Sequence, residues 1–224
     1  HAEGYQTIAS GDYSHAEGTG SLAIGEASHA EGGLFFSGKG TLSSPTSATT
    51  YSSHAEGRGT LSSGQGSHSE GWFTTASGGG SHAEGHNGIA SGEGSHAEGF
   101  SAVASGDFSH AEGNSSTASG ANAHAGGSGS IASGSSSFVH SINSLATGDR
   151  SAILGGFGIT GTTDDTVYVP YLNINNLATG TSVNSLGIDS VGNVVTSSTS
   201  GSGDFLPLTG GTISGTTLPA LTVY

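Results

Sequence analysis

The sequence predicts an all-β fold: a β-solenoid of 14-residue coils whose larger residues must be covered by neighbouring chains. Three observations lead to this prediction. The motif Ser-His-Ala-Glu-Gly recurs at a fixed spacing, a second motif of small residues lies halfway between its copies, and glycine accounts for 42 of 224 residues. With only 32% hydrophobic residues, one copy cannot build a thick core, so a thin repetitive architecture is the ordered alternative.

Composition and charge exclude several function classes. The net charge of −14 opposes binding to nucleic acid phosphates or to an anionic membrane. The chain has no cysteine, so disulfides and thiolate metal sites are excluded, and we expect oligomerisation to supply stability. No apolar run approaches the roughly 18 residues of a membrane-spanning helix, and no signal peptide is visible. Because the chain starts within the motif at His1, we interpret it as a piece of a longer protein.

The first motif fixes the length of the coil. Its histidines are spaced 14 residues apart throughout, except for one step that carries 11 extra residues. The last copy reads His-Ala-Gly-Gly, without the glutamate. The histidines are His1, His15, His29, His54, His68, His82, His96, His110 and His124.

The second motif shortens the underlying period to seven residues. It begins with Thr7–Gly11 and recurs to Ser144–Gly148, and its phase continues through Ser151–Gly155. Each copy reads small-x-Ala-x-Gly, which contains too much Gly and Ser for a helical heptad and lacks the Gly at every third residue that collagen needs. We therefore expect two five-residue strands per coil, joined by two-residue turns. Positions one, three and five form a small inner face, and positions two and four point outward.

The segment Ser21-Leu22-Ala23-Ile24-Gly25 resembles the Ser-Val-Ala-Ile-Gly strand in YadA-like heads of trimeric autotransporter adhesins. The resemblance covers residues 1–160. It implies a left-handed parallel β-roll and a trimer in which one strand of each coil faces the threefold axis. The His-Ala-Glu strand departs from that family, which carries two apolar residues there. This version is similar to head-type repeats in phage tail and fibre proteins.

The remainder of the chain also resembles phage fibres. Asp204–Gly215 is similar to a segment that recurs in tail fibres, and Val167–Ile174 predicts a stalk strand. Asp189–Asn193 predicts a turn between two strands, and the Ser/Thr/Gly run at 197–203 predicts a flexible joint. We divide the chain into head repeats at 1–160, with an insertion loop at 33–53, a β-stranded connector at 161–200, and a further fibre segment at 201–224.

The histidines and the following glutamates point to the same side of one strand, so stacked coils place them in ladders with rungs about 4.8 Å apart. The ladder comprises the nine histidines above with Glu3, Glu17, Glu31, Glu56, Glu70, Glu84, Glu98 and Glu112. In the favoured interpretation it is structural and faces the trimer axis, with His donating to Glu. In a second it faces solvent, and Ile and Leu of the other strand face the axis. In a third it binds metal, which needs three or four ligands converging on one point; we assign no metal site.

Receptor contacts are expected at turns and insertions, where solenoids present variable residues. We place six of the 11 extra residues before Thr41 and five after Pro45. The candidate contacts are Leu34, Phe35, Phe36, Tyr51, Trp72 and Phe73. In the alternative interpretation, the loop folds over a neighbouring chain and buries its own aromatic rings.

These features predict a structural protein and not an enzyme, with no catalytic residue and no cofactor. The acids are spread along the ladder rather than clustered in one groove, as a polysaccharide-degrading solenoid enzyme would need. The favoured function is a segment of a trimeric phage-type tail fibre or virion appendage that supports host attachment. Its partners would be two further copies, other fibre or tail proteins, and a cell-surface glycan or protein receptor. The alternative is the head of a trimeric autotransporter-like adhesin on a bacterial surface.

Overall fold

The computed structural model describes residues 1–33, 35–37, 41–171, 185–188 and 194–197, with side chains described for 1–33 and 45–171. It separates the chain into two units, His1–Leu172 and Asn173–Tyr224, which are described one at a time. The predicted turn at 189–193, the fibre-like segment Asp204–Gly215 and nearly all of the joint at 197–203 lie outside the described residues.

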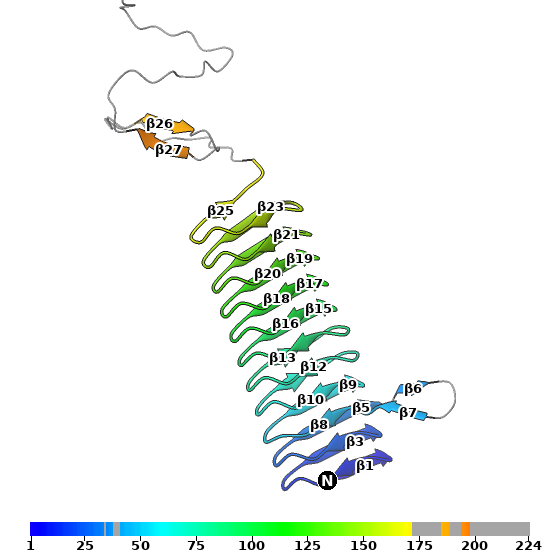
Figure 1. Cartoon of the computed structure of the whole chain (residues 1–224). Coiled ribbons are helices and arrows are strands. Elements are labelled where there is room, and N and C mark those ends of the chain that lie inside the picture. The colour runs from blue at the N-terminus through cyan, green and yellow to red at the C-terminus, as the bar shows by residue number, and fades with distance from the viewer. Residues whose placement is uncertain (34, 38–40, 172–184, 189–193, 198–224) are drawn as a thin grey trace, which may run out of the picture. The chain divides into compact units, whose positions relative to one another are not determined.

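The first unit is a solenoid of stacked coils, each contributing one strand to each of two parallel sheets (Figure 1). The first sheet, sheet A, has twelve strands and carries the His-Ala-Glu motif. They are β1 (Ala2–Tyr5), β3 (His15–Thr19), β5 (His29–Gly33), β9 (His54–Arg58), β11 (His68–Ser69), β13 (His82–Ala83), β15 (His96–Phe100), β17 (His110–Asn114), β19 (His124–Ser128), β21 (Phe138–Ile142), β23 (Ala152–Phe157) and β25 (Val167–Tyr168).

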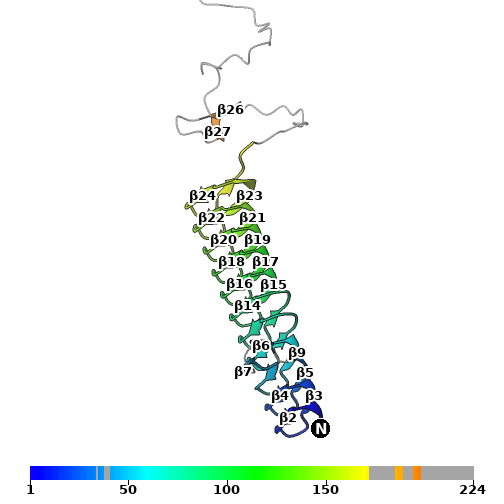
Figure 2. The same ribbon diagram turned by 90° about the vertical axis from the view of Figure 1, so that its right-hand side faces the viewer.

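The second sheet, sheet B, has eleven strands and carries the small-x-Ala-x-Gly motif (Figure 2). They are β2 (Ile8–Ala9), β4 (Leu22–Ala23), β8 (Ser47–Ala48), β10 (Leu61–Ser62), β12 (Thr75–Ala76), β14 (Ile89–Ala90), β16 (Val103–Ala104), β18 (Thr117–Ala118), β20 (Ile131–Ala132), β22 (Leu145–Ala146) and β24 (Thr160–Gly161). No helix occurs in the described residues, so none of them forms an apolar helix able to span a membrane.

The register between coils places each residue beside its equivalent in the next repeat. His96 pairs with His110, and Ala97 pairs with Ala111. The predicted parallel solenoid with 14-residue coils is therefore confirmed. The spacing changes where Leu145 pairs with Thr160, which adds one residue to the last coil. A bulge in the pairing of β21 with β23 occurs at the same end of the solenoid.

The core between the sheets consists almost entirely of small side chains. The central alanine is fully buried in most copies of the motifs, as Ala16 of sheet A and Ala23 of sheet B illustrate, whereas Ala2 and Ala9 of the first coil keep exposure. Ser21 and Ser28, at the first positions, are also buried. The predicted inner face of Ser, Ala and Gly is confirmed, and larger side chains at positions two and four point outward, where they retain exposure. The core is well packed because the two sheets lie close together, and not because its side chains are large.

The strands of sheet B are shorter than predicted. Each has two residues and not five, because the chain turns before the motif ends. In the turn after β4, the backbone N–H of Ser28 donates to the carbonyl of Gly25 at 3.2 Å and its hydroxyl donates to the same carbonyl at 2.6 Å. Ala27 adopts a positive φ of 54°, which closes the turn. The turn therefore takes residues that the repeat pattern assigned to a strand.

The described part of the insertion is one antiparallel pair of strands, and the predicted division of its 11 extra residues is wrong. Strands β6 (Phe35–Ser37) and β7 (Thr41–Ser44) pair antiparallel (Figure 1). Ser47 then pairs with Leu22 of the preceding coil, so the regular motif resumes at Thr46. All extra residues are thus accommodated at one edge of the solenoid, between β5 and β8.

The sheets continue beyond residue 160, since β25 pairs parallel with β23. Val167–Tyr168 thus belongs to the solenoid sheet, whereas the domain boundaries chosen from the sequence stay predictions. In the second unit, β26 (Ser185–Ile188) and β27 (Val194–Ser197) form an antiparallel pair. The strands expected on either side of 189–193 are therefore present.

Candidate functional site: a histidine–glutamate ladder

The outer face of sheet A carries the predicted ladder, because in-register parallel pairing places every motif His beside the next. The rings from His1 to His110 stack with centroids 4.6–5.0 Å apart and interplanar angles of 2–12°. This separation matches the spacing of adjacent strands. The stack ends at His124, whose ring is turned 80° from that of His110. Phe138 occupies the ladder position of the following coil, 4.8 Å from His124.

The glutamates pair with the histidines inside one chain, in two different registers. In the first four rungs each Nε2 faces the Glu of its own strand, at 3.6–3.9 Å. In the last four rungs each Nε2 faces the Glu of the preceding coil, at 3.3–3.4 Å. These pairs stay about one-third exposed apart from the terminal His1–Glu3 pair, so each contributes little alone.

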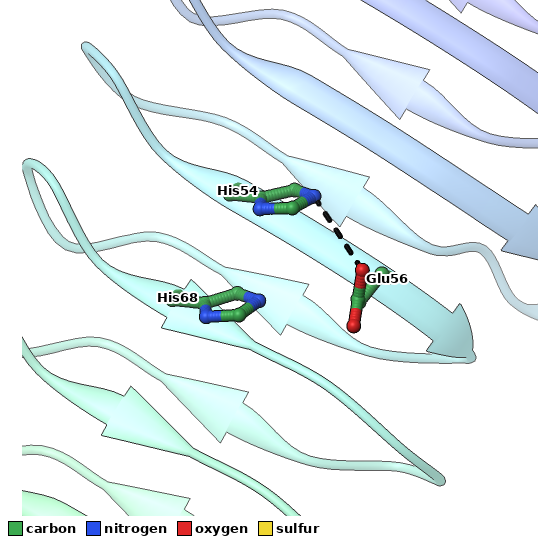
Figure 3. A group of neighbouring side chains, drawn as sticks. All are labelled: His54, Glu56 and His68. Carbon is green, nitrogen blue, oxygen red and sulfur yellow. Dashed lines mark ion pairs between the residues drawn. The ribbon is translucent and has the colours of Figure 1, made fainter.

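The change of register leaves one histidine without a carboxylate. Glu56 pairs with His54 at 3.8 Å, while Glu70 pairs with His82 at 3.4 Å. His68 lies in the coil between His54 and His82, and among the described residues it makes no ion pair with a carboxylate. Figure 3 shows Glu56 paired with His54 and not with His68. The nine motif histidines are accompanied by eight glutamates, because Gly126 stands where the ninth would be.

Burial favours the neutral form of two histidines in the ladder. The Nε2 atoms of His54, His68 and His124 are inaccessible to solvent and make no hydrogen bond of good geometry. Desolvation, followed by the charges of His68 and His29, lowers the pKa of His54. Desolvation and His110 likewise lower the pKa of His124. A neutral imidazole has a free lone pair, so His54 and His124 are competent metal ligands.

The end of the ladder brings together a group that the sequence analysis did not identify. Nε2 of His124 lies 3.4 Å from Oε1 of Glu112, and Nδ1 of His140 lies 3.6 Å from the same oxygen. Burial alone would raise the pKa of Glu112, but His124 and other neighbours lower it. The signal was in the sequence, because residues 112, 126 and 140 occupy equivalent positions in three successive coils. His140 was overlooked because its strand lacks the His-Ala-Glu signature.

The candidate receptor residues do not gather at one place. Tyr51 lies in the turn that leads from sheet B to sheet A, and Trp72 and Phe73 lie at the opposite edge, where sheet A leads to sheet B. Tyr51 and Trp72 are each 52% exposed. Leu34 lies outside the described residues, and the side chains of Phe35 and Phe36 are likewise not described.

The edge that carries Trp72 also carries a stacked column that the sequence analysis missed in part. The guanidinium of Arg58 lies 5.5 Å from the Trp72 ring centroid. Trp72 and His86 are 5.9 Å apart, and His86 stacks on Phe100 at 5.0 Å. Their positions pair from coil to coil, continuing the strands of sheet A. His86 and Phe100 are parallel within 2°, whereas Trp72 is tilted 44° from His86, so the column stabilises the edge and leaves Trp72 about half exposed.

Comparison with known proteins identifies the repeats. The YadA head domain repeat matches residues 16–33, 73–95, 97–123 and 111–137. No curated protein matches the chain. The matched ranges all lie in the solenoid, whose parallel 14-residue coils agree with a YadA-like β-roll. The matched stretches of the first unit are therefore similar to YadA head domain repeats, in sequence and in the 14-residue coil that they form.

Proposed function

We propose that this chain is a structural segment of a homotrimeric phage-type tail fibre or virion appendage that supports attachment to a host surface. The observation that carries the proposal is the thin alanine core of the solenoid, which buries little apolar area within one chain. YadA-type heads are trimeric, and two further copies would supply the missing burial. A continuous solenoid of this kind, with no predicted catalytic residue, serves as a structural element that extends the fibre.

Sheet B is the better candidate for the face at the trimer axis. Its outward Ile8, Leu61, Ile89 and Ile131 keep exposed fractions of 37–50% in the single chain. The ladder of sheet A, in contrast, already pairs its glutamates with histidines of the same chain. Burial at the axis stabilises the exposed apolar residues of sheet B more than it stabilises His–Glu pairs that already form within one chain. We therefore assign sheet B to the axis and the ladder to the outside, the reverse of the interpretation favoured from the sequence.

The assembly can be tested by measuring the mass of the purified chain with multi-angle light scattering. We expect a trimer, and Ile89→Asp should convert it to monomers because a carboxylate cannot be buried at the axis. The matched control is His82→Asp on sheet A, which should leave the trimer intact. A monomeric parent chain would refute the trimer, and dissociation by His82→Asp alone would assign the axis to sheet A.

The alternative function is the head of a bacterial trimeric autotransporter-like adhesin. The match to the YadA head domain repeat and the Ser21–Gly25 strand favour it. The two functions share one architecture and differ in the rest of the gene. A coiled-coil stalk with a membrane anchor downstream would identify the adhesin, whereas neighbouring tail genes would identify the virion fibre. In either case labelled trimers should bind the surface of the host cell.

A further inference from the structure

We propose that Glu112, His124 and His140 bind one zinc-type divalent cation at the end of the histidine ladder. The three residues come from β17, β19 and β21, so the ion would join three consecutive coils of sheet A. One ligand atom from each lies within 4.8 Å of the other two. Two imidazole nitrogens and one carboxylate oxygen form a common zinc ligand set that leaves the fourth position to water.

The distances suit a tetrahedral ion. Zn²⁺ binds nitrogen and oxygen at about 2.0–2.1 Å, which places neighbouring ligands of a tetrahedron about 3.3–3.4 Å apart. Glu112 Oε1 lies 3.4 Å from His124 Nε2 and 3.6 Å from His140 Nδ1. Only the distance between the nitrogens of His124 and His140 must shorten for all three ligands to reach one ion. His140 has a side chain 62% exposed and therefore has room to make this movement.

Gly126 opens the site. It pairs with His140 in the register, at the position where earlier coils carry glutamate. A Cβ atom at Gly126 would lie 2.7 Å from Nδ1 of His140 and 2.9 Å from Oε1 of Glu112. Any side chain there would thus push two of the ligands away. Because glycine stands here in place of glutamate, this coil also lacks the carboxylate that would otherwise compete for an imidazole of the ladder.

The geometry distinguishes this group from the regular rungs. His124 has left the parallel stack, at 80° to His110, whereas His29 is parallel to its neighbours within 5°. Parallel rings direct their nitrogens side by side and not toward a common point. Nε2 of His124 is inaccessible to solvent and makes no well-formed hydrogen bond, although it faces the carboxylate. A cation between the two groups would satisfy both.

Zn²⁺ alone, added to the full chain after treatment with a chelator, tests the proposal by isothermal titration calorimetry. We expect one tight equivalent per chain and a higher melting temperature. His140→Ala and Gly126→Ala should each weaken binding at least tenfold. His29→Ala, taken from the regular Glu17–His29–Glu31 group, should leave the tight equivalent unchanged.

Circular dichroism shows whether each variant keeps its β structure, and the exposed side chain of His140 lies outside the alanine core. Co²⁺ in place of Zn²⁺ should give the strong visible absorption of tetrahedral coordination in the parent chain and not in His140→Ala. The proposal is overturned if the parent chain binds no zinc. It is also overturned if His140→Ala and Gly126→Ala retain binding, or if His29→Ala weakens it equally, since binding would then belong to the ladder as a whole.

Discussion

Replacing Gly78 by alanine tests whether contact between backbones, and not side-chain bulk, holds the solenoid together. Gly78 follows β12 at the fifth position of its motif and lies against the next coil. A Cβ atom there would overlap the carbonyl oxygen of Gly92, and it would lie 2.5 Å from the carbonyl carbon of Gly92 and 3.0 Å from the oxygen of Ser91. These neighbours are backbone atoms, so no side-chain rotation relieves the overlap. The coils must separate locally.

The magnitude follows from what must move. Overpacking a core by one or two methylene groups costs about 1–3 kcal/mol when side chains can adjust. Here the backbone itself must move far enough to remove the overlap with the new Cβ atom. We therefore expect the free energy of unfolding to fall by at least about 3 kcal/mol, near the upper range for single substitutions. Because each coil contacts only its neighbours, the loss falls on the interface between two coils and can split the melting transition.

The adjacent Gly79 provides a matched control. A Cβ atom at this position would meet nothing within 4 Å, and Gly79 does not have a positive φ. Gly79→Ala should therefore be neutral, or stabilise by about 0.4–1 kcal/mol through the unfolded chain. Guanidinium denaturation followed by circular dichroism measures both variants. If the free energy of unfolding of Gly78→Ala lies within about 0.5 kcal/mol of that of the parent chain, close backbone packing is not the reason that this position needs glycine.

Three further predictions concern the interior and the ladder. Ala104→Leu should destabilise by about 1–3 kcal/mol or more in denaturant titrations, because Ala104 is fully buried. His68→Phe should stabilise by about 1 kcal/mol in the same assay, since it removes a buried nitrogen that lacks a partner and preserves the stack. Stability should fall as pH drops below about 6.5, because the pKa values of His54 and His124 are lowered and the unfolded chain binds protons first.

Each of these has its own control. Val103→Leu lies beside Ala104 but points outward, so an equal loss at both positions would contradict the assignment of the inner face. His96→Phe removes the hydrogen bond to Glu84 at 3.3 Å and should destabilise, unlike His68→Phe. In the acid titration, melting temperature should decline further below about pH 4.5, where the lowered pKa of Glu112 adds to the loss. A flat profile between pH 7 and 4 would rule out this linkage.

The repeat made most of the fold predictable. Spacing alone gave the coil length, the parallel register and the alternation of small inner and large outer residues, because a strand has a period of two and a parallel register repeats it. The ladder followed from the same argument, since His15 and Glu17 lie two residues apart on one strand. The length of the sheet B strands did not follow, because turns such as Gly25–Ser28 are closed by hydrogen bonds that a repeat pattern does not encode.

The register of pairing between His and Glu was also beyond the sequence. An imidazole reaches the carboxylate of its own strand or of the preceding coil at nearly equal distance, 3.6 Å for His29 and 3.3 Å for His96. Such a choice depends on small rotations of the side chains. The insertion was misplaced for a related reason: Thr41–Pro45 fits the small-residue pattern as well as Thr46–Thr50 does. Only the pairing of Ser47 with Leu22 decides between them.

Departures from the repeat locate the positions where this chain makes contacts that its regular coils lack. A regular coil repeats one set of contacts, so a ligand that recognises a single coil needs a feature that the other coils lack. Gly126 is such a departure, because it removes one carboxylate and lets His140 approach Glu112. The same loss leaves eight carboxylates for nine histidines, and the unpaired imidazole lies four coils away at His68. Substituting Gly126 by Glu should therefore act at both ends, closing the cation site and offering His124 a carboxylate in its own strand. A register that then changed throughout the last four rungs would show that the ladder behaves as one connected unit.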